Sequence, residues 1–309
     1  MVDRQPLASW NDGPVKSAIF DFVARATKPG GAEFAPPAER IAVFDNDGTL
    51  CCEQPLQIQF YFAFNRVKEL AAKDPTMAER QPFKAVLEDD YNMLFGLGLQ
   101  ALYELAFATH AGITDEEFVE IARGWLATAK HPKVGRLFKE CVYQPQVELI
   151  AYLRENGFKT YIVSAGGVDF MRAFVEEAYG VPREQVIGSS VKLRLDVGGD
   201  RVSLSKLSEL NIFNDREAKP LSIGLHIGRR PLLAFGNSGW RPCHDALREI
   251  WTWPAACATA PPRRRRARGG LRSGVQIEPV VRGARPGSGL RHHRRKYEAG
   301  LEGRVLIGA

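Results

Sequence analysis

The sequence predicts an α/β fold built on a mainly parallel sheet, with a helical segment inserted into it. Short apolar runs at 41–44, 158–163 and 232–235 alternate with stretches of helical periodicity. This alternation indicates a parallel sheet with helices on both faces. Small or polar residues follow each run, at the edge where open α/β sheets bind ligands.

The chain before and after the first strand is expected to be largely helical. Residues 1–40 are predicted to form a helix at 15–26 and then a linker rich in proline and glycine. Residues 53–140 are predicted to form helices at 57–72, 81–97 and 114–129. Thr114 and Glu117 have the spacing of a capping box, which favours a helix start there.

The elements of residues 141–238 alternate in type. The predicted order is a helix at 145–156, a strand at 158–163, a helix at 168–179, a hairpin made of 186–191 and 202–204, and a strand at 232–235. Gly198-Gly199-Asp200 supplies the turn of the hairpin. We therefore expect the sheet to be formed by residues 41–52 and 141–238 together.

Two carboxylates follow the first strand, in Phe44-Asp45-Asn46-Asp47-Gly48-Thr49-Leu50. One of them can attack and also hold a cation, and the other can shuttle a proton, which suits phosphoryl transfer. The same letters also occur as an ordinary strand followed by an Asp-Gly turn. The pattern therefore needs support from the rest of the chain.

That support comes from polar residues near other strand ends. Ser164 follows the strand at 158–163, Asn237 follows the strand at 232–235, and Lys219 precedes a predicted helix. A hydroxyl, a lysine and small-residue turns with free backbone N–H groups suit a phosphate. Glu53 is either a substrate contact or simply an exposed acid at a helix start.

Four ordered motifs resemble the haloacid dehalogenase superfamily, and within it the phosphoserine-phosphatase-like hydrolases. They are Phe-Asp-Asn-Asp-Gly-Thr-Leu, Ile-Val-Ser-Ala-Gly-Gly, Lys219 and Phe-Gly-Asn-Ser, and the similarity covers roughly residues 8–238. The resemblance implies a Rossmann-like core, with 53–140 as a helical cap that closes over the site and excludes water.

The resemblance also implies a role for each matching residue. Asp45 is the expected nucleophile and a magnesium ligand, and Asp47 is the acid and base with its backbone carbonyl facing the metal. Ser164, Gly166 and Lys219 are expected to bind the transferring phosphoryl group. Asn237 falls at a metal-ligand position, and Mg2+ suits such hard oxygen ligands. The implied substrate is a small phosphorylated metabolite.

Composition sets further bounds. Five cysteines show no CxxC spacing, so we expect neither a zinc site nor a disulfide framework. There is no apolar run of about 20 residues and no secretory pattern at the start of the chain, so we expect no membrane span and a cytoplasmic protein. Neither the oligomeric state nor the substrate's identity can be inferred.

The charge of the chain is uneven. Residues 239–309 hold 15 Lys/Arg and 5 Asp/Glu, a balance of +10, whereas residues 1–238 hold 27 and 31, a balance of −4. Helical and strand periodicity also ends after Ser238. We expect this segment to be disordered.

A change of reading frame explains the segment better than a selected basic tail. One set of the codons permitted for Gly239 to Arg248, read one base later, encodes Asp-Gly-Asp and then an apolar helix, which is the continuation that the family pattern has. Arg241 stands where that pattern has a metal-supporting acid, so we expect this exact chain to be poorly stable and either weakly active or inactive.

Two other functions remain open. One is a different phosphotransferase reaction within the same superfamily. The other is a non-catalytic protein that binds nucleic acid through the basic segment at 239–309. The frame change accounts for the same charges and argues against the nucleic-acid function.

Overall fold

The computed structural model describes residues 6–198, 201–237, 255–259, 276–278 and 304–308. Its sheet has the strand order β4-β3-β2-β1-β5-β8-β6-β7. The central strands β1 (Ile41–Phe44), β2 (Lys159–Gly167), β3 (Val186–Gly198) and β5 (Leu233–Gly236) are parallel where they pair. The predicted α/β class with a mainly parallel core sheet is confirmed.

The outer strands pair in the antiparallel sense. On one side, β4 (Arg201–Ile212) forms a long hairpin with β3. On the other side, β8 (Arg304–Gly308) pairs with β5 and with β6 (Ala255–Thr259), and β6 pairs with β7 (Gln276–Glu278). The strands β6, β7 and β8 lie in the segment 239–309 and differ from the disorder predicted for it. The rest of this segment lies outside the described residues, where disorder stays a prediction.

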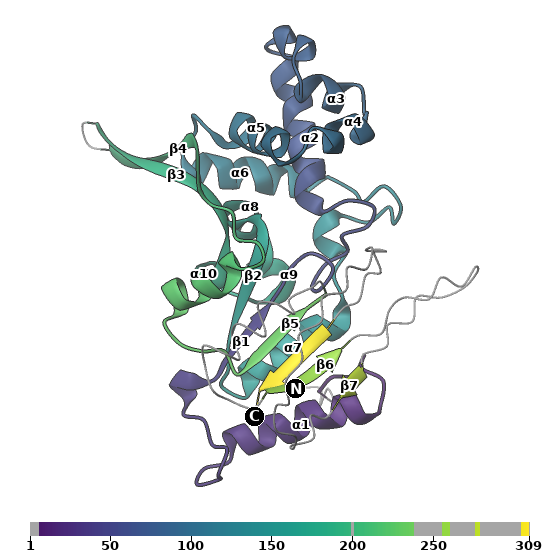
Figure 1. Ribbon diagram of the computed structural model, residues 1–309, viewed down its shortest axis with the longest axis vertical. Helices are drawn as coiled ribbons and strands as arrows, with labels where there is room; N and C mark the ends of the chain where they lie inside the picture. Colours follow the sequence, from purple (N-terminus) through teal and green to yellow (C-terminus); the bar gives the residue numbers. More distant parts are fainter. Residues whose placement is uncertain (1–5, 199–200, 238–254, 260–275, 279–303, 309) are drawn as a thin grey trace, which may run out of the picture.

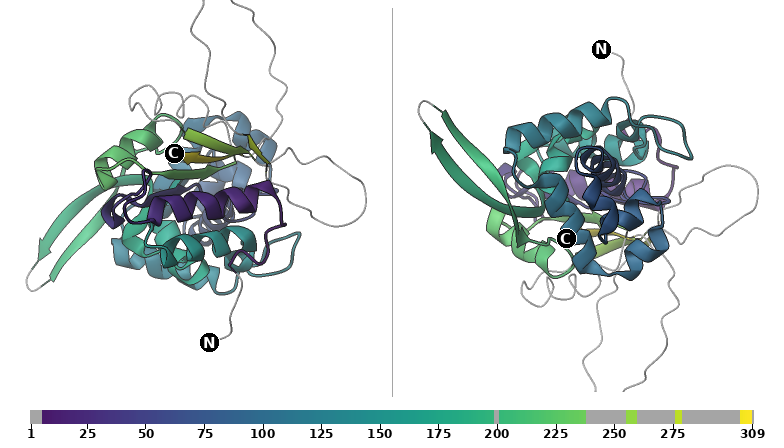
Figure 2. Two further views of the ribbon diagram at one scale, coloured as in Figure 1. Left: turned by 90° about the horizontal axis from the view of Figure 1, so that it is seen from below. Right: turned by 90° about the horizontal axis from the view of Figure 1, so that it is seen from above.

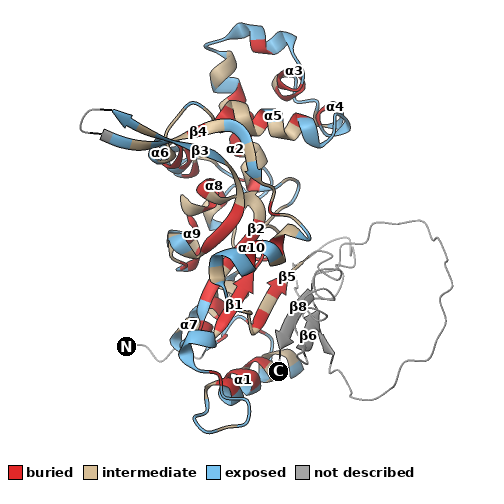
Figure 3. Ribbon diagram, turned by 60° about the vertical axis from the view of Figure 1, so that its left-hand side comes forward, coloured by how far each residue is buried: buried red, intermediate tan, exposed pale blue. Residues whose placement is uncertain are grey.

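Alternate residues of the central strands point to opposite faces of the sheet. Ala42 and Phe44 face a core that includes residues of α1 (Pro14–Thr27) and α7 (Gln144–Glu155). Ile41 and Val43 face a smaller cluster that includes Ile223 of α10 (Ala218–Ile227). Helices therefore cover both faces of the central strands, whose residues are mostly buried (Figure 3).

Residues 53–140 form a helical body at the end of the molecule opposite α1 (Figure 1). Its helices are α2 (Ile58–Ala71), α3 (Phe83–Leu87), α4 (Tyr91–Gly96), α5 (Leu99–His110) and α6 (Asp115–Leu126), with 3-10 turns at Pro75–Glu79 and Phe138–Glu140. They enclose a core of their own, which includes Phe64, Val86 and Leu105. Phe62 packs instead against Phe118 and Phe170, so this body is also continuous with the main core.

The sequence-based element boundaries need several corrections. The helix predicted at 81–97 is two short helices, α3 and α4, because Asp89 has a positive φ of 54° between them and Asp90 caps α4 with its side chain. The helix α5 was not predicted. The helix predicted at 168–179 is divided into α8 (Val168–Arg172) and α9 (Val175–Tyr179). The capping box of Thr114 and Glu117 is confirmed.

The hairpin of β3 and β4 is longer than predicted and projects from the body in both views of Figure 2. Its register places Leu195 opposite Leu204 and Val197 opposite Val202. These four side chains are exposed, with 61% of Leu195 and 71% of Val197 accessible to solvent. One face of the outer hairpin is therefore an exposed apolar stripe.

Within the described residues, no helix combines the length and the apolar character that crossing a membrane requires.

Candidate active site

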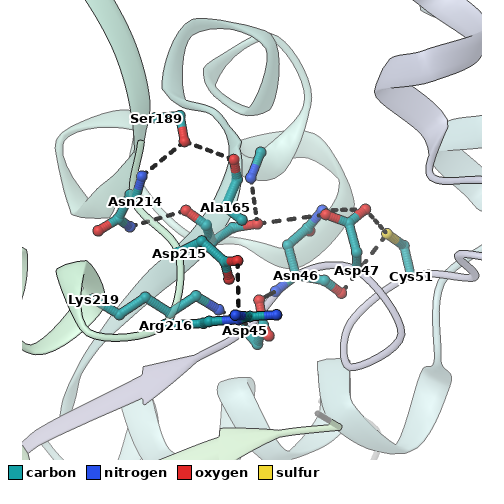
Figure 4. Close-up of polar contacts among 12 residues, drawn as sticks. Asp45, Asn46, Asp47, Cys51, Ala165, Ser189, Asn214, Asp215, Arg216 and Lys219 are labelled. Carbon is teal, nitrogen blue, oxygen red and sulfur yellow. Dashed lines mark hydrogen bonds and ion pairs between the residues drawn. The ribbon is translucent and has the colours of Figure 1, made fainter. Parts of the chain in front are cut away.

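Three neighbouring strands position the predicted site residues. β1 lies between β2 and β5 in the sheet, and Asp45, Ser164 and Asn237 lie at or near the carboxyl ends of these three strands. Because carboxyl ends of parallel strands share one edge of the sheet, side chains far apart in sequence come together there (Figure 4).

Asp45 is almost completely buried, with 5% of its surface exposed. Its backbone amide donates to the Phe235 carbonyl at 2.8 Å, which fixes the residue against β5. Its carboxylate accepts a hydrogen bond from the Asn46 amide at 2.8 Å through Oδ1, and Lys219 Nζ lies 3.0 Å from Oδ2. Lys219 is also buried, and it lies in the first turn of α10 rather than ahead of a helix as the sequence predicted.

Asp47 has a different environment. Ser164 Oγ lies 3.4 Å from its Oδ2, and the Asn46 side-chain amide donates to Oδ1 at 3.4 Å. Burial and then the neighbouring charge of Asp45 raise the pKa of Asp47 from 3.8 to about 6, against smaller opposing effects that include Lys219. This carboxyl can therefore change its protonation state near neutral pH.

β2 continues through Gly167, beyond the strand end predicted at residue 163, and side-chain hydrogen bonds hold its last residues. The Gly166 amide donates to Ser164 Oγ at 3.0 Å, and the Gly167 amide donates to Gln59 Oε1 at 2.7 Å. Gln59 belongs to α2, so the helical body reaches the same edge of the sheet. A side chain at position 167 would collide with Gln59, whose Nε2 lies 2.6 Å from the place of a Cβ atom.

Gly48 has a φ of +74°, a conformation that favours glycine, and it lies against Asn237 and Glu53. The place of a Cβ atom at Gly48 is 1.7 Å from Asn237 Nδ2 and 2.8 Å from Glu53 Cδ. Asn237 and Glu53 therefore lie together beside the Asp45–Asp47 turn. Glu53 Oε2 is buried without a hydrogen-bond partner in the structure. The interpretation of Glu53 as an exposed acid at a helix start therefore does not fit this atom.

These residues fit a hard cation without forming a complete carboxylate cage. The negative charges of Asp45 and Asp47 repel each other, which a cation between them would offset. The side-chain amide of Asn237 and the unpartnered Oε2 atom of Glu53 are two further candidate ligands beside them. Within the described ranges, no group of three or more His, Cys, Asp or Glu residues could hold a metal ion. The set resembles Mg2+ sites in which one or two carboxylates act with substrate and water oxygens. Arg241 lies outside the described residues.

Sequence reasoning missed two polar contacts of this site. Asn214 is fully buried, and its side-chain amide donates to the Ser164 carbonyl at 2.9 Å, while its backbone amide donates to Ser189 Oγ at 2.9 Å. The only sequence signal for Asn214 is its place in the segment that leads to Lys219. Gln59 gives no such signal, because one glutamine at a helix start has no motif.

A second buried ionic group lies between the hairpin and the helices. Lys206 of β4 has a fully buried side chain whose Nζ pairs with Asp169 of α8 and lies 2.8 Å from Asp115 Oδ1 of α6. It also lies over the Phe118 ring, 5.3 Å from the centroid. Because Asp169 follows Gly167 by two residues, the group connects the helical body and the hairpin to the segment that carries Ser164.

A model of a protein family described as haloacid dehalogenase-like hydrolase matches residues 42–239, well over half of the chain. No curated protein matches the sequence.

The solved structures to which this chain is similar have low sequence identity to it. A conserved protein of unknown function from Anaerococcus prevotii is 16% identical, with a TM-score of 0.47, over 78% of this chain and 91% of that one. A protein of unknown function from Bordetella pertussis is 19% identical, with a TM-score of 0.44, over 63% and 80%. A phosphoserine phosphohydrolase-like protein from Francisella tularensis is 17% identical, with a TM-score of 0.32, over 61% and 72%.

Proposed function

Because the chain belongs to the haloacid dehalogenase-like hydrolase family, we propose that it is a magnesium-dependent phosphomonoester hydrolase that forms an aspartyl-phosphate. The observation that carries this proposal is the difference between its two carboxylates. Asp45 faces Lys219 at 3.0 Å, whereas burial and Asp45 raise the pKa of Asp47 to about 6. Two carboxyl groups whose environments differ in this way suit a nucleophile and an acid/base pair.

The first step transfers the phosphoryl group to the protein. An Asp45 oxygen attacks phosphorus while the protonated Asp47 gives its proton to the leaving oxygen. Ser164 Oγ and the backbone amide of Gly166 bind the phosphoryl oxygens. Without substrate, the Gly166 amide donates to Ser164 Oγ at 3.0 Å, and this bond is replaced by hydrogen bonds to the substrate. The Lys219 ammonium offsets the charge that develops on these oxygens.

The second step regenerates the enzyme. Asp47, now ionised, takes a proton from water as the water attacks the phosphorus of the aspartyl-phosphate, and Asp45 leaves as a carboxylate. Bound Mg2+, held by Asp45, the Asp47 backbone carbonyl and Asn237, would supply Lewis-acid stabilisation of the phosphoryl charge. The helical body at 53–140 acts as the cap over this site and excludes water from it. The substrate is a small phosphorylated metabolite.

The frame change belongs to the same proposal. The family match ends at residue 239, where the sequence pattern is also lost, and this supports a disruption at that point. In the restored frame, an aspartate replaces Arg241 and can support the cation. Loss of such a supporting group typically weakens metal binding by about 10–100-fold.

A screen of phosphomonoesters with the present chain and with the frame-restored chain tests the proposal. We expect Mg2+-dependent phosphate release from the restored chain and at least about tenfold less from the present chain. Asp45→Asn should lower release by roughly a thousandfold or more, as removal of a nucleophile does. Equal release by Asp45→Asn and its parent would exclude the proposed nucleophile.

Binding of nucleic acid by 239–309 stays an alternative hypothesis. It predicts DNA binding that weakens steeply with salt and disappears when these residues are deleted.

A further inference from the structure

The two linkers that join residues 53–140 to the sheet run side by side as a short antiparallel ladder. Cys51 and Val142 form an isolated antiparallel bridge. On one side of this bridge, the Tyr143 amide donates to the Leu50 carbonyl at 2.8 Å. On the other side, the Cys52 amide donates to the Cys141 carbonyl at 3.0 Å. This register places Cys52 opposite Cys141, at the end of the ladder nearer to the helical body.

The spacing of such a pair suits a disulfide. Cys52 and Cys141 share one backbone hydrogen bond, because the Cys141 amide donates to the Phe138 carbonyl at 3.0 Å instead. Opposite residues that share both bonds have Cα atoms about 5.5 Å apart, and disulfides span Cα distances of about 4.4–6.8 Å. The Cys141 thiol donates to the Leu137 carbonyl at 3.3 Å, and the Cys52 thiol donates to the Gln54 carbonyl at 3.7 Å. Both side chains must rotate away from these contacts for the two sulfur atoms to meet.

The surroundings of the cysteines distinguish this pair from Cys51. Both Cys52 and Cys141 are partly exposed free thiols, whereas Cys51 is buried. Burial and then the nearby Cys52 raise the pKa of Cys141, which agrees with their closeness. A small oxidant can therefore reach Cys52 and Cys141 but not Cys51.

We propose that Cys52 and Cys141 are a site of reversible disulfide formation that fastens the entry and exit linkers of the cap to each other. The bond itself does not depend on the proposed phosphatase activity. Its effect on catalysis rests on that proposed function.

The oxidant is a low-molecular-weight disulfide such as oxidised glutathione. The thiolate of Cys52 attacks one sulfur of the oxidant, the S–S bond breaks, and one thiol leaves. The Cys141 thiolate then attacks the Cys52 sulfur of this mixed disulfide and releases the second thiol. The two cysteines lose two electrons and two protons, and the oxidant becomes two thiols.

Two consequences follow from the position of this bond. It closes a loop that contains the whole helical body, so it restricts the unfolded chain and should raise the midpoint of thermal unfolding. It also fixes the linker torsions, which must change if the body moves as a lid. We therefore expect oxidation to slow turnover.

The test uses the full chain in a background where Cys243 and Cys257 are replaced by serine. The reduced protein is incubated with oxidised glutathione, the remaining thiols are alkylated after denaturation, and intact mass and peptide masses are measured. We expect a species that has lost two hydrogens, with a cross-link between Cys52 and Cys141 and an alkylated Cys51. Unmodified thiols or persistent glutathione adducts without this cross-link would overturn the proposal.

Matched variants test its specificity. Cys52→Ser and Cys141→Ser should each lose the cross-linked species, and Cys51→Ser should keep it. Oxidation of the unfolded chain in concentrated urea is the control, because there the Cys51–Cys141 and Cys52–Cys141 cross-links should form equally readily. If the native chain gave the same mixture of these two cross-links, the proposed register would be contradicted.

Activity provides the last readout. Phosphate release should fall by at least about tenfold on oxidation and recover with a thiol reductant, since displacement by about 1 Å can cost on the order of 100-fold. Unchanged release from the cross-linked chain would refute the effect on turnover. If neither form releases phosphate, the proposed function fails while the masses still decide whether the disulfide forms.

Discussion

Lys219 Nζ lies 3.0 Å from Asp45 Oδ2, and both side chains are almost completely buried. A single charge at this depth would lose its hydration without compensation, whereas an ion pair keeps both groups charged. The pair also connects the end of β1 to the first turn of α10. The proposed nucleophile and the cation that faces it are therefore held by two different elements of the core.

Lys219→Met should remove this compensation. We expect phosphate release by the frame-restored chain to fall by roughly 100-fold or more, because a charged group that faces the phosphoryl oxygens is lost. The free energy of unfolding should fall by about 3–5 kcal/mol, because Asp45 is left buried and unpaired. Urea unfolding and phosphate assays measure the two effects. Lys192→Met is the control, since its partner Glu209 is exposed and such pairs contribute about 0–1 kcal/mol. Equal losses in the two variants would contradict a special role for the buried pair.

Asp47→Asn should change the pH dependence of stability. In the folded chain, burial and Asp45 raise the pKa of Asp47 from 3.8 to about 6. The folded state thus binds this proton more tightly than the unfolded state. The bound proton of Asp47 therefore adds about 3 kcal/mol to the free energy of unfolding. This contribution is fully present below about pH 4 and is lost as the pH rises through about 6. Urea unfolding from pH 4 to 7 with a metal chelator should show this slope in the parent and not in Asp47→Asn. Asp12→Asn, at an exposed carboxylate, should keep it. Identical slopes in parent and Asp47→Asn would contradict the raised pKa.

Lys206→Met should destabilise the chain by about 3–5 kcal/mol, because it leaves the buried Asp169 and the partly exposed Asp115 around a neutral side chain. Adding Asp169→Asn should restore part of this loss, since it removes one of the two unpaired charges. The free energies of unfolding of the parent, the two single variants and the double variant measure the coupling. A double variant with simply additive losses would show that the buried group does not act as a unit.

Sequencing of the gene across the codons of Asn237 to Arg241 tests the frame change. We expect one extra base relative to close relatives, so that its removal restores Asp-Gly-Asp after Ser238. The restored chain should also bind Mg2+ at least about tenfold more tightly, because it regains a supporting carboxylate. Calorimetric titration with MgCl2 measures this affinity. A gene that reads without an extra base would remove the frame hypothesis, and the basic segment would then need another explanation.

Local signals predicted the elements that depend on local chemistry. The apolar run of β1, the stop at Gly180 and the capping box at Thr114 are all properties of a few neighbouring residues. The order of the motifs along the chain placed Asp45, Ser164, Lys219 and Asn237 at one edge of the sheet. The structure brings these elements together there, and the catalytic roles remain proposals.

Other features depend on contacts that no short pattern contains. The break between α3 and α4 requires a left-handed residue at Asp89, and periodicity over 81–97 conceals it. The contact of Gln59 with Gly167 depends on how α2 crosses the sheet edge. Likewise, the sequence around Lys206 indicates only a charged strand residue, and its ion pairs with Asp115 of α6 and Asp169 of α8 form through tertiary packing. Tertiary packing, rather than local propensity, decides these three features.

The contact of Gly48 with Asn237 has a consequence for sequence variation. Any side chain at position 48 would need both a left-handed backbone and the space that the Asn237 amide already occupies. Even alanine would push apart β5 and the turn that carries Asp45 and Asp47. In a library with every amino acid at each position, we expect position 48 to accept glycine alone, whereas Gly180, also left-handed but with open space around it, should tolerate asparagine.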